Sequence, residues 1–171
     1  MSRVVFVVAP SNFRDEELFE PLDELKKAGV ETTISSTKVG ECIGKLGGKV
    51  NSELLVDEVD TKKFEGVVFV GGNGVLEHKL YENEGVLKLA KDFYNTNKLV
   101  CAICIAPRIL TCARVINGRK ATTFPDEQNI EEIKAQGVYT GKSVEVDGKL
   151  VTADGPQSAR RFGKAIVKAL K

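Results

Sequence analysis

Apolar residues along the chain gather in short runs, and longer amphipathic segments separate these runs. Four runs are rich in β-branched residues: "RVVFVVA" (3–9), "VETTISS" (30–36), "GVVFV" (66–70) and "KLVCAI" (98–103). Runs of this kind are typical of strands that a parallel sheet buries on both faces. We therefore predict a strand in each of these segments.

The segments between the runs predict helices and hairpins. Leu18, Leu22 and Leu25 recur at helical spacing in a segment that is expected to stop at Gly29. Further helices are predicted over 82–97, 106–116, 126–136 and 155–170, and hairpins over 38–59 and around the turn at 147–148. Strands that alternate with helices indicate an α/β fold with a doubly wound, mostly parallel sheet, whose sites lie at the carboxyl ends of the strands.

Length and composition narrow the class of protein. The chain has 171 residues and shows no linker or repeat, so we expect one domain over 1–171. A net charge of only +1 argues against a dedicated nucleic-acid or membrane-surface binder, and no apolar run is long enough to cross a bilayer. The 4 cysteines do not form a disulfide framework, and no secretory signal is visible. A cytoplasmic location is the expectation.

Cys104 carries the most informative pattern, because it lies where the run 98–103 turns directly into the predicted helix 106–116. A sharp strand-to-helix turn exposes one side chain and directs backbone N–H groups at its substrate, as a nucleophile requires. The alternative is a small buried hydrophobic side chain. The position of Cys104 at the turn favours the nucleophile.

Two other features are expected to share a crevice with Cys104. "GGNG" (71–74) follows the run 66–70, and its backbone N–H, paired with that of Ile105, could bind a developing oxyanion; alternatively it is a plain turn. Acidic residues 15–17 open the helix after the first strand. They could complement the helix dipole, and spacing alone does not choose a catalytic carboxylate among them.

The remaining cysteines and the histidine give weaker indications of function. Cys101 has redox-motif spacing to Cys104, but it lies inside a strand and is expected on the opposite face, so neither a redox pair nor a zinc site is favoured. Cys42 is interpreted as a surface residue of a hairpin and Cys112 as buried in a helix. His78 is the only histidine and is expected to be exposed at a helix start.

In combination, these segments resemble the DJ-1/PfpI family over nearly the whole chain. The segments that carry the resemblance are "EELFEPLDELKKAG", "GVVFVGGNG", "VCAICIAPRIL", "RKATTFPD" and "VTADGPQSARRFGKAIVKAL". The resemblance implies a flavodoxin-like α/β sandwich, commonly a homodimer. No cofactor and no metal are expected. It also implies that Glu17, four residues before Pro21, bonds the thiol of Cys104, and that Gly72 and Ile105 supply the oxyanion N–H donors.

The chain departs from the family at both of its familiar histidine positions. Ile105 follows the cysteine where PfpI-type peptidases carry histidine, and Phe124 stands in "TTFP" where DJ-1-type members offer one. Ala106 replaces a glycine. Since a leaving amine must be protonated in peptide hydrolysis, these departures disfavour a PfpI-type cysteine peptidase.

Three functional hypotheses follow. In the first, Cys104 is rich in thiolate at neutral pH, and Glu17 holds the shared proton. The pair would act on a small dicarbonyl such as methylglyoxal, as a glyoxalase-like or deglycase-like enzyme whose partner is a small-molecule carbonyl substrate. The alternatives are a redox-sensing or chaperone-like protein that uses an oxidisable Cys104, and the disfavoured peptidase.

Overall fold

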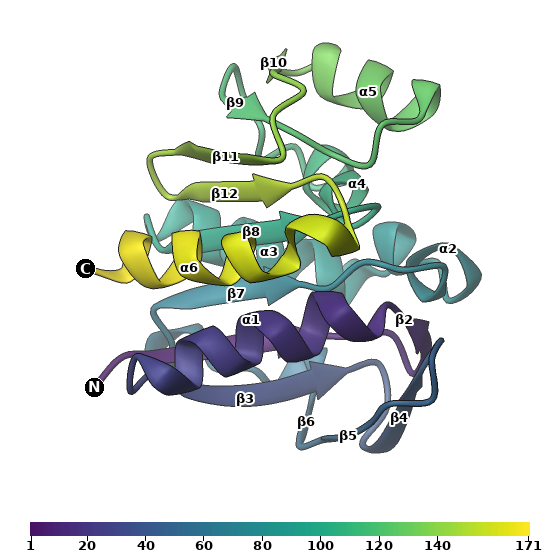
Figure 1. Cartoon of the computed structure of the whole chain (residues 1–171), viewed down its shortest axis with the longest axis vertical. Coiled ribbons are helices and arrows are strands. Elements are labelled where there is room, and N and C mark those ends of the chain that lie inside the picture. Colours follow the sequence, from purple (N-terminus) through teal and green to yellow (C-terminus); the bar gives the residue numbers. More distant parts are fainter.

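The computed structural model describes all residues from 1 to 171 and shows a seven-stranded sheet between two layers of helices (Figure 1). The strand order is β11-β12-β8-β7-β1-β3-β6, and every neighbouring pair is parallel except β11 with β12. The bounds are β1 Arg3–Val7, β3 Glu31–Ser36, β6 Leu54–Leu55, β7 Gly66–Phe69, β8 Leu99–Ile103, β11 Val144–Asp147 and β12 Leu150–Ala153. The predicted doubly wound, mostly parallel sheet is confirmed.

Helices cover both faces of this sheet. In Figure 1, α1 (Asp15–Lys27) and α6 (Ala159–Leu170) lie side by side in front of the strands, and α3 (Glu84–Asn95) lies behind them. Helix α1 approaches α6 closely at Gly163, where a Cβ would come within 2.8 Å of the Cα of Pro21. The other helices are α2 Gly74–Glu77, α4 Pro107–Cys112 and α5 Glu127–Lys134, with short 3-10 turns η1 Val56–Glu58, η2 Thr61–Lys63, η3 Leu80–Glu82 and η4 Pro156–Ser158.

The core has two apolar layers, one on each side of the sheet. Strand β1 alternates between them: Val5 and Val7 pack in the layer toward α3 and α4, whereas Val4 and Phe6 pack in the layer toward α1 and α6. A strand that is buried on both faces needs apolar residues at every position. This requirement explains the continuous apolar runs of the sequence.

Small sheets extend the fold beyond the central one. Strands β4 (Gly40–Gly44) and β5 (Lys49–Ser52) form an antiparallel hairpin that joins β2 (Ser11–Phe13). Strands β9 (Lys120–Ala121) and β10 (Val138–Tyr139) pair separately. Both predicted hairpins are confirmed, the second turning at Gly148 with φ +61°.

Two predicted helices differ from those observed. The segment 106–116 is helical only as far as Cys112, because Arg114 takes a left-handed φ of 58° and the N–H of Val115 turns back to the carbonyl of Leu110. The final helix begins at Ala159, after the turn η4.

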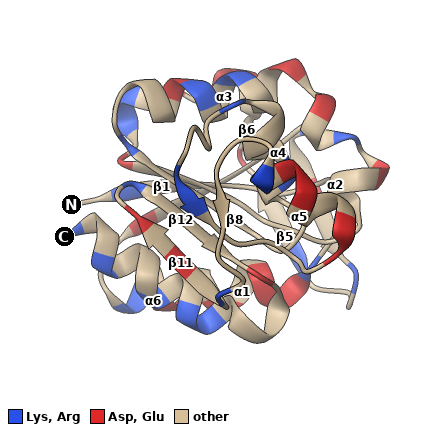
Figure 2. Cartoon of the chain, turned by 90° about the horizontal axis from the view of Figure 1, so that it is seen from above, with Lys and Arg blue, Asp and Glu red and all other residues tan.

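The surface carries charges of both signs. Figure 2 shows blue and red segments interspersed along the outer helices, in agreement with a net charge of +1. None of the helices is both long and apolar enough to span a membrane.

Candidate active site

Cys104 directly follows strand β8 and has a left-handed φ of 64°, which is uncommon for a residue with a Cβ. Neighbouring backbone holds it there: its N–H donates to the carbonyl of Ala153 at 2.9 Å, and its carbonyl accepts from Thr123 Oγ1 at 2.9 Å and Phe124 N at 2.8 Å. Such a conformation costs about 1–3 kcal/mol and persists only where surrounding contacts impose it. The predicted turn at Cys104 is therefore present.

Glu17 and Cys104 both pack on Gly71. A Cβ on Gly71 would collide with Glu17 Oε1 and come within 2.8 Å of the Cβ of Cys104. Glu17 is fully buried in the first turn of α1, and neither of its carboxyl oxygens has a hydrogen bond of standard geometry. Pro21, four residues later, has no N–H group, so it cannot donate the usual helical hydrogen bond to the carbonyl of Glu17. The structure thus brings together the loops that follow β1, β7 and β8.

The other two acidic residues of this segment have structural partners. Asp15 Oδ1 and Oδ2 accept from the backbone N–H of Leu46 at 2.8 Å and of Gly48 at 2.7 Å. Glu16 accepts from the guanidinium of Arg14 at 2.8 Å and 3.1 Å. Only Glu17 reaches Cys104, a distinction that spacing along the chain could not make.

The two expected N–H donors also lie beside the sulfur. Backbone N–H groups of Ile105 and Gly72 both favour the charged form of the Cys104 thiol and so act to lower its pKa. Gly72 has a φ of 107°, and a Cβ there would come within 2.8 Å of the carbonyl oxygen of Asn12, so the close approach requires glycine. Their use as an oxyanion hole stays a prediction.

These residues open into a cavity of about 240 Å³. Its lining consists of Arg14, Glu17, Lys45, Gly72, Asn73, Cys104, Ile105, Phe124 and Pro156. The cavity lies at the carboxyl ends of the strands, where open α/β sheets bind their ligands. No three His, Cys, Asp or Glu side chains are grouped so that they could hold a metal ion.

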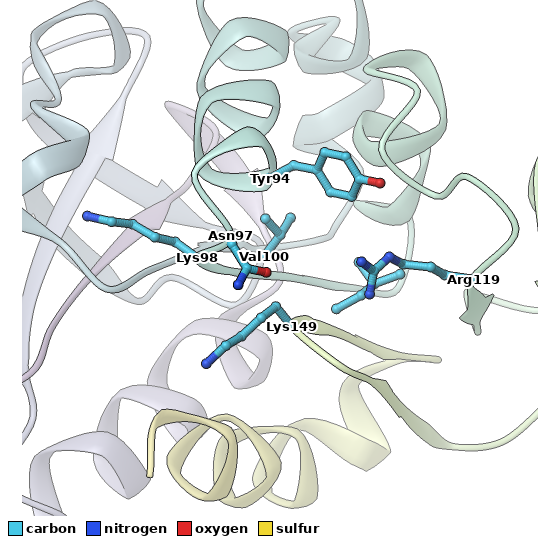
Figure 3. Close-up of a pocket in the computed structure, with 7 residues that line it drawn as sticks. Tyr94, Asn97, Lys98, Val100, Arg119 and Lys149 are labelled. Atoms are coloured by element: carbon cyan, nitrogen blue, oxygen red, sulfur yellow. The ribbon is translucent and has the colours of Figure 1, made fainter.

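A second cavity lies at the opposite, amino ends of β8 and β12 (Figure 3). Tyr94, Lys98, Arg119 and Lys149 surround it, but its volume is only about 10 Å³, which is the lower limit for one water. Lys98 Nζ is already bonded to the carbonyls of Thr61 and Phe64, both at 2.6 Å. We therefore place the candidate substrate site at Cys104.

Burial controls the protonation of the Glu17–Cys104 pair. It raises the pKa of Glu17 to about 8, although the Cys104 thiol and the guanidinium of Arg14 favour the charged carboxylate. Burial also raises the pKa of the Cys104 thiol, and the neighbouring carboxylate raises it further. The expectation of a thiolate-rich Cys104 at neutral pH is wrong, because burial outweighs the two N–H donors. Both pKa shifts favour the form in which the carboxyl and the thiol keep their protons.

The other cysteines differ from the sequence expectations. Cys101 and Cys104 pack in the same apolar layer, because the alternation of faces ends with strand β8 at Ile103. Cys42 is fully buried on the inner face of β4, whereas Cys112 is exposed on the outer side of α4. All 4 cysteines are free.

His78 is exposed, as expected, but it follows α2 rather than starting a helix. Its Nε2 lies 2.8 Å from Ser11 Oγ, and it does not line the cavity. Phe124 stands at the cavity in place of the family histidine. Sequence reasoning missed Arg14 and Lys45 as lining residues, since neither belongs to a recognisable motif.

Comparisons with known proteins agree with this geometry. The family model described as the DJ-1/PfpI family matches residues 2–169. Uncharacterized protein MJ0967 of Methanocaldococcus jannaschii is 42% identical over 99% of this chain and 83% of its own length. Deglycase PYRAB04690 of Pyrococcus abyssi is 33% identical over 98% of this chain and 99% of its own.

A solved structure shows the same fold. The ThiJ/PfpI domain protein from Brachyspira murdochii superposes with a TM-score of 0.93 at 34% identity, covering 98% of this chain and 95% of that one. The family model, the relatives and the fold all lead to one assignment: the chain belongs to the DJ-1/PfpI family.

Proposed function

We propose that the protein is a Cys104-dependent enzyme of the glyoxalase or deglycase type that acts on small reactive dicarbonyls. One observation carries the proposal: a buried Glu17 carboxyl, whose pKa is raised to about 8, packs with Cys104 on Gly71 at the base of a cavity. A general acid or base is most effective when its pKa lies near the working pH. Relatives named deglycases support the same class of reaction.

The first step would form a hemithioacetal. The ionised minority of Glu17 takes the thiol proton while the sulfur of Cys104 bonds to the aldehyde carbon of methylglyoxal. Negative charge develops on the aldehyde oxygen, where the N–H groups of Gly72 and Ile105 can stabilise it. That oxygen then takes the proton back from Glu17, so the step needs no external acid.

The second step would move a proton within the adduct. Glu17 removes the hydrogen of the former aldehyde carbon, and the neighbouring ketone carbon receives a proton in its place. The first carbon is thereby oxidised to a thioester and the second reduced to an alcohol, so no external oxidant or reductant is required. Hydrolysis of the thioester by water releases lactate and restores the thiol.

This sequence explains how the site could work without a histidine. Peptide hydrolysis would require a proton for a leaving amine, which His supplies in cysteine peptidases. Here both family histidine positions hold apolar residues, Ile105 and Phe124, and no imidazole lines the cavity. A single carboxyl group suffices for the isomerisation because it only relays protons.

The test is incubation with methylglyoxal while lactate is followed, wild type against Cys104→Ala. The proposal expects many equivalents of lactate from the wild type and a background rate from the variant. Equal rates from the two proteins, with both folded, would rule out Cys104 as the nucleophile.

A redox-sensing role is the second candidate, and one observation favours it. The unpartnered oxygens of Glu17 lie beside Cys104, so a protonated Glu17 could donate to an oxidised sulfur. A sensor would show stoichiometric oxidation of Cys104 by peroxide and no turnover of dicarbonyl. The lactate measurement therefore separates the two candidates.

A homodimer in the cytoplasm completes the proposal. The β4–β5 hairpin and the adjoining α1 carry exposed apolar side chains. Their exposed fractions are 61% for Leu46, 42% for Ile43 and 37% for Phe19, and together they offer an apolar surface for a second copy. Four free cysteines suit a reducing compartment. Light scattering would show twice the monomer mass for the wild type and the monomer mass for Leu46→Glu.

A further inference from the structure

We propose that the Cys104 cavity recognises carbonyl compounds that carry an anionic group, a carboxylate or a phosphate, and that Lys45 is the residue that binds this group. The catalytic consequence rests on the proposed function, but the binding of the anion does not. Three observations carry the inference: the charges around the cavity, the way in which the Lys45 turn is held, and the room available.

The cavity has an excess of positive charge. Arg14 and Lys45 line it, and Glu17 is its only acidic side chain. Glu16 neutralises Arg14 through two hydrogen bonds, at 2.8 Å and 3.1 Å. Lys45 has no carboxylate within 4.0 Å and no side-chain hydrogen bond, in contrast to Lys49 on the same hairpin, whose Nζ lies 4.0 Å from Glu41. Lys45 is thus a cation at the cavity without a counter-ion.

The turn that carries Lys45 is fixed in place. The N–H of Lys45 donates to the carbonyl of Phe13 at 2.9 Å. The buried carboxylate of Asp15 accepts from the next residue, Leu46, and from Gly48. A Cβ on Gly44 or Gly48 would strike that carboxylate. The first turn of α1, which also positions Glu17, therefore holds the backbone of Lys45 at the cavity.

The cavity is larger than methylglyoxal requires. Its volume of about 240 Å³ is many times the ~10–15 Å³ that one water needs. A dicarbonyl bonded to Cys104 would fill only the base and leave room toward Lys45. An anionic group on the far carbon would occupy that room and contact the ammonium group of Lys45, which has no counter-ion. The cavity would therefore bind anionic carbonyl compounds in preference to neutral ones.

Alkylation of Cys104 by two reagents that differ in charge tests the anion site without any turnover. Rate constants for iodoacetate and for neutral iodoacetamide are measured by peptide mapping at pH 8 and low salt, and their ratio is compared between variants. Lys45→Met should lower the ratio at Cys104 about three- to tenfold, as loss of one nearby charge implies. The difference should shrink in about 1 M NaCl, where screening is strong.

Lys49→Met is the matched control, because it removes the same charge from the same hairpin but away from the cavity. It should leave the ratio at Cys104 within about twofold of the wild type, and neither variant should change the ratio at the exposed Cys112. If Lys45→Met also stays within twofold, or if Lys49→Met lowers the ratio as much, the proposal is overturned.

Competitors identify the anion and separate this inference from the proposed function. Glyoxylate should protect Cys104 from iodoacetamide better than its neutral methyl ester, and Lys45→Met should remove the advantage. Inorganic phosphate and acetate are added separately as competitors. The anion that Lys45 binds more tightly should slow the alkylation of Cys104 by iodoacetate more strongly. Protection that depends on Lys45 supports the anion site even if methylglyoxal is never converted. Equal protection by glyoxylate and its ester contradicts it even if lactate forms.

Discussion

The carboxyl group of Glu17 and the side chain of Cys104 pack against the same glycine, Gly71, although the two residues are 87 positions apart in the 171-residue chain. Gly71 permits this contact because a Cβ there would occupy the space of both groups. Burial raises the pKa of both groups, and each group also shifts the pKa of the other. Most of the expected behaviour of the site follows from this contact.

The first prediction concerns the pH dependence of catalysis. In its reactive form the Glu17–Cys104 pair holds one proton. Below the Glu17 pKa of about 8, the main form of the pair holds two protons. We expect kcat/KM for methylglyoxal to rise about tenfold per pH unit below pH 8 and to level off above it. A profile that is flat from pH 6 to 9 would contradict the assignment of Glu17.

The second prediction concerns stability. The Glu17 pKa rises from 4.5 to about 8 on folding, so the folded state keeps a proton that the unfolded state releases above pH 4.5. The stabilising effect of this proton is complete below pH 4.5 and is lost as pH rises toward 8. Relative to Glu17→Gln, the wild-type free energy of unfolding should fall by about 3 kcal/mol between pH 5 and 8.

Urea unfolding of both proteins at the two pH values measures this difference directly. The comparison across pH cancels any constant cost of burying the glutamine amide. An unchanged difference between the two proteins would show that Glu17 is ionised in the folded protein.

The third prediction separates the cysteines. Cys104→Ala should abolish lactate formation, whereas Cys42→Ala, Cys101→Ala and Cys112→Ala should keep most of it. Only Cys104 lines the cavity. Cys42 and Cys101 are fully buried, so their loss costs stability rather than chemistry, and thermal melting checks folding. An equal loss of activity in another folded variant would overturn the assignment.

The fourth prediction concerns His78. His78→Ala should leave dicarbonyl consumption within about twofold of the wild type, because the imidazole bonds Ser11 outside the cavity. Steady-state kinetics at pH 7 provide the measurement. A fall of about two orders of magnitude, typical of a lost general base, would mean that His78 takes part.

The fifth prediction concerns oxidation. Mild peroxide should convert Cys104 to the sulfinate before the other cysteines react, since Cys104 alone combines access to the cavity with a neighbouring carboxyl that can take up its proton and N–H donors that stabilise the thiolate. The sulfinate yield should be highest in the wild type, lower in Glu17→Gln and lowest in Glu17→Ala, because a protonated Glu17 can donate to a sulfinate oxygen. Peptide mapping reports the position of the added oxygens. A disulfide between Cys101 and Cys104 would contradict this scheme.

Sequence patterns predicted the central sheet well, because strands that are buried on both faces require continuous apolar runs. They also located the turn at Cys104. They could not select Glu17 from residues 15–17, since the choice depends on which carboxyl faces Gly71. Nor could they predict the end of α4, because Arg114 adopts a left-handed conformation that glycine usually supplies.

The burial of individual cysteines was less predictable for a related reason. Cys42 lies on a short strand whose inner face is covered by the main core, and Cys112 lies on a helix of only 6 residues with one side in solvent. The raised pKa of Cys104 reflects the depth of the thiol, which local sequence does not encode. Lys45 gains its significance only from the turn that Asp15 holds.

The most direct test of the central claim is the number of lactate molecules formed per protein molecule from excess methylglyoxal, measured by proton NMR for the wild type and Glu17→Gln. The account predicts many turnovers for the wild type. It predicts a rate lower by about two orders of magnitude or more for Glu17→Gln, which retains the shape of the site but cannot relay a proton. Equal turnover by the two folded proteins, or less than one lactate per wild-type molecule, would contradict it.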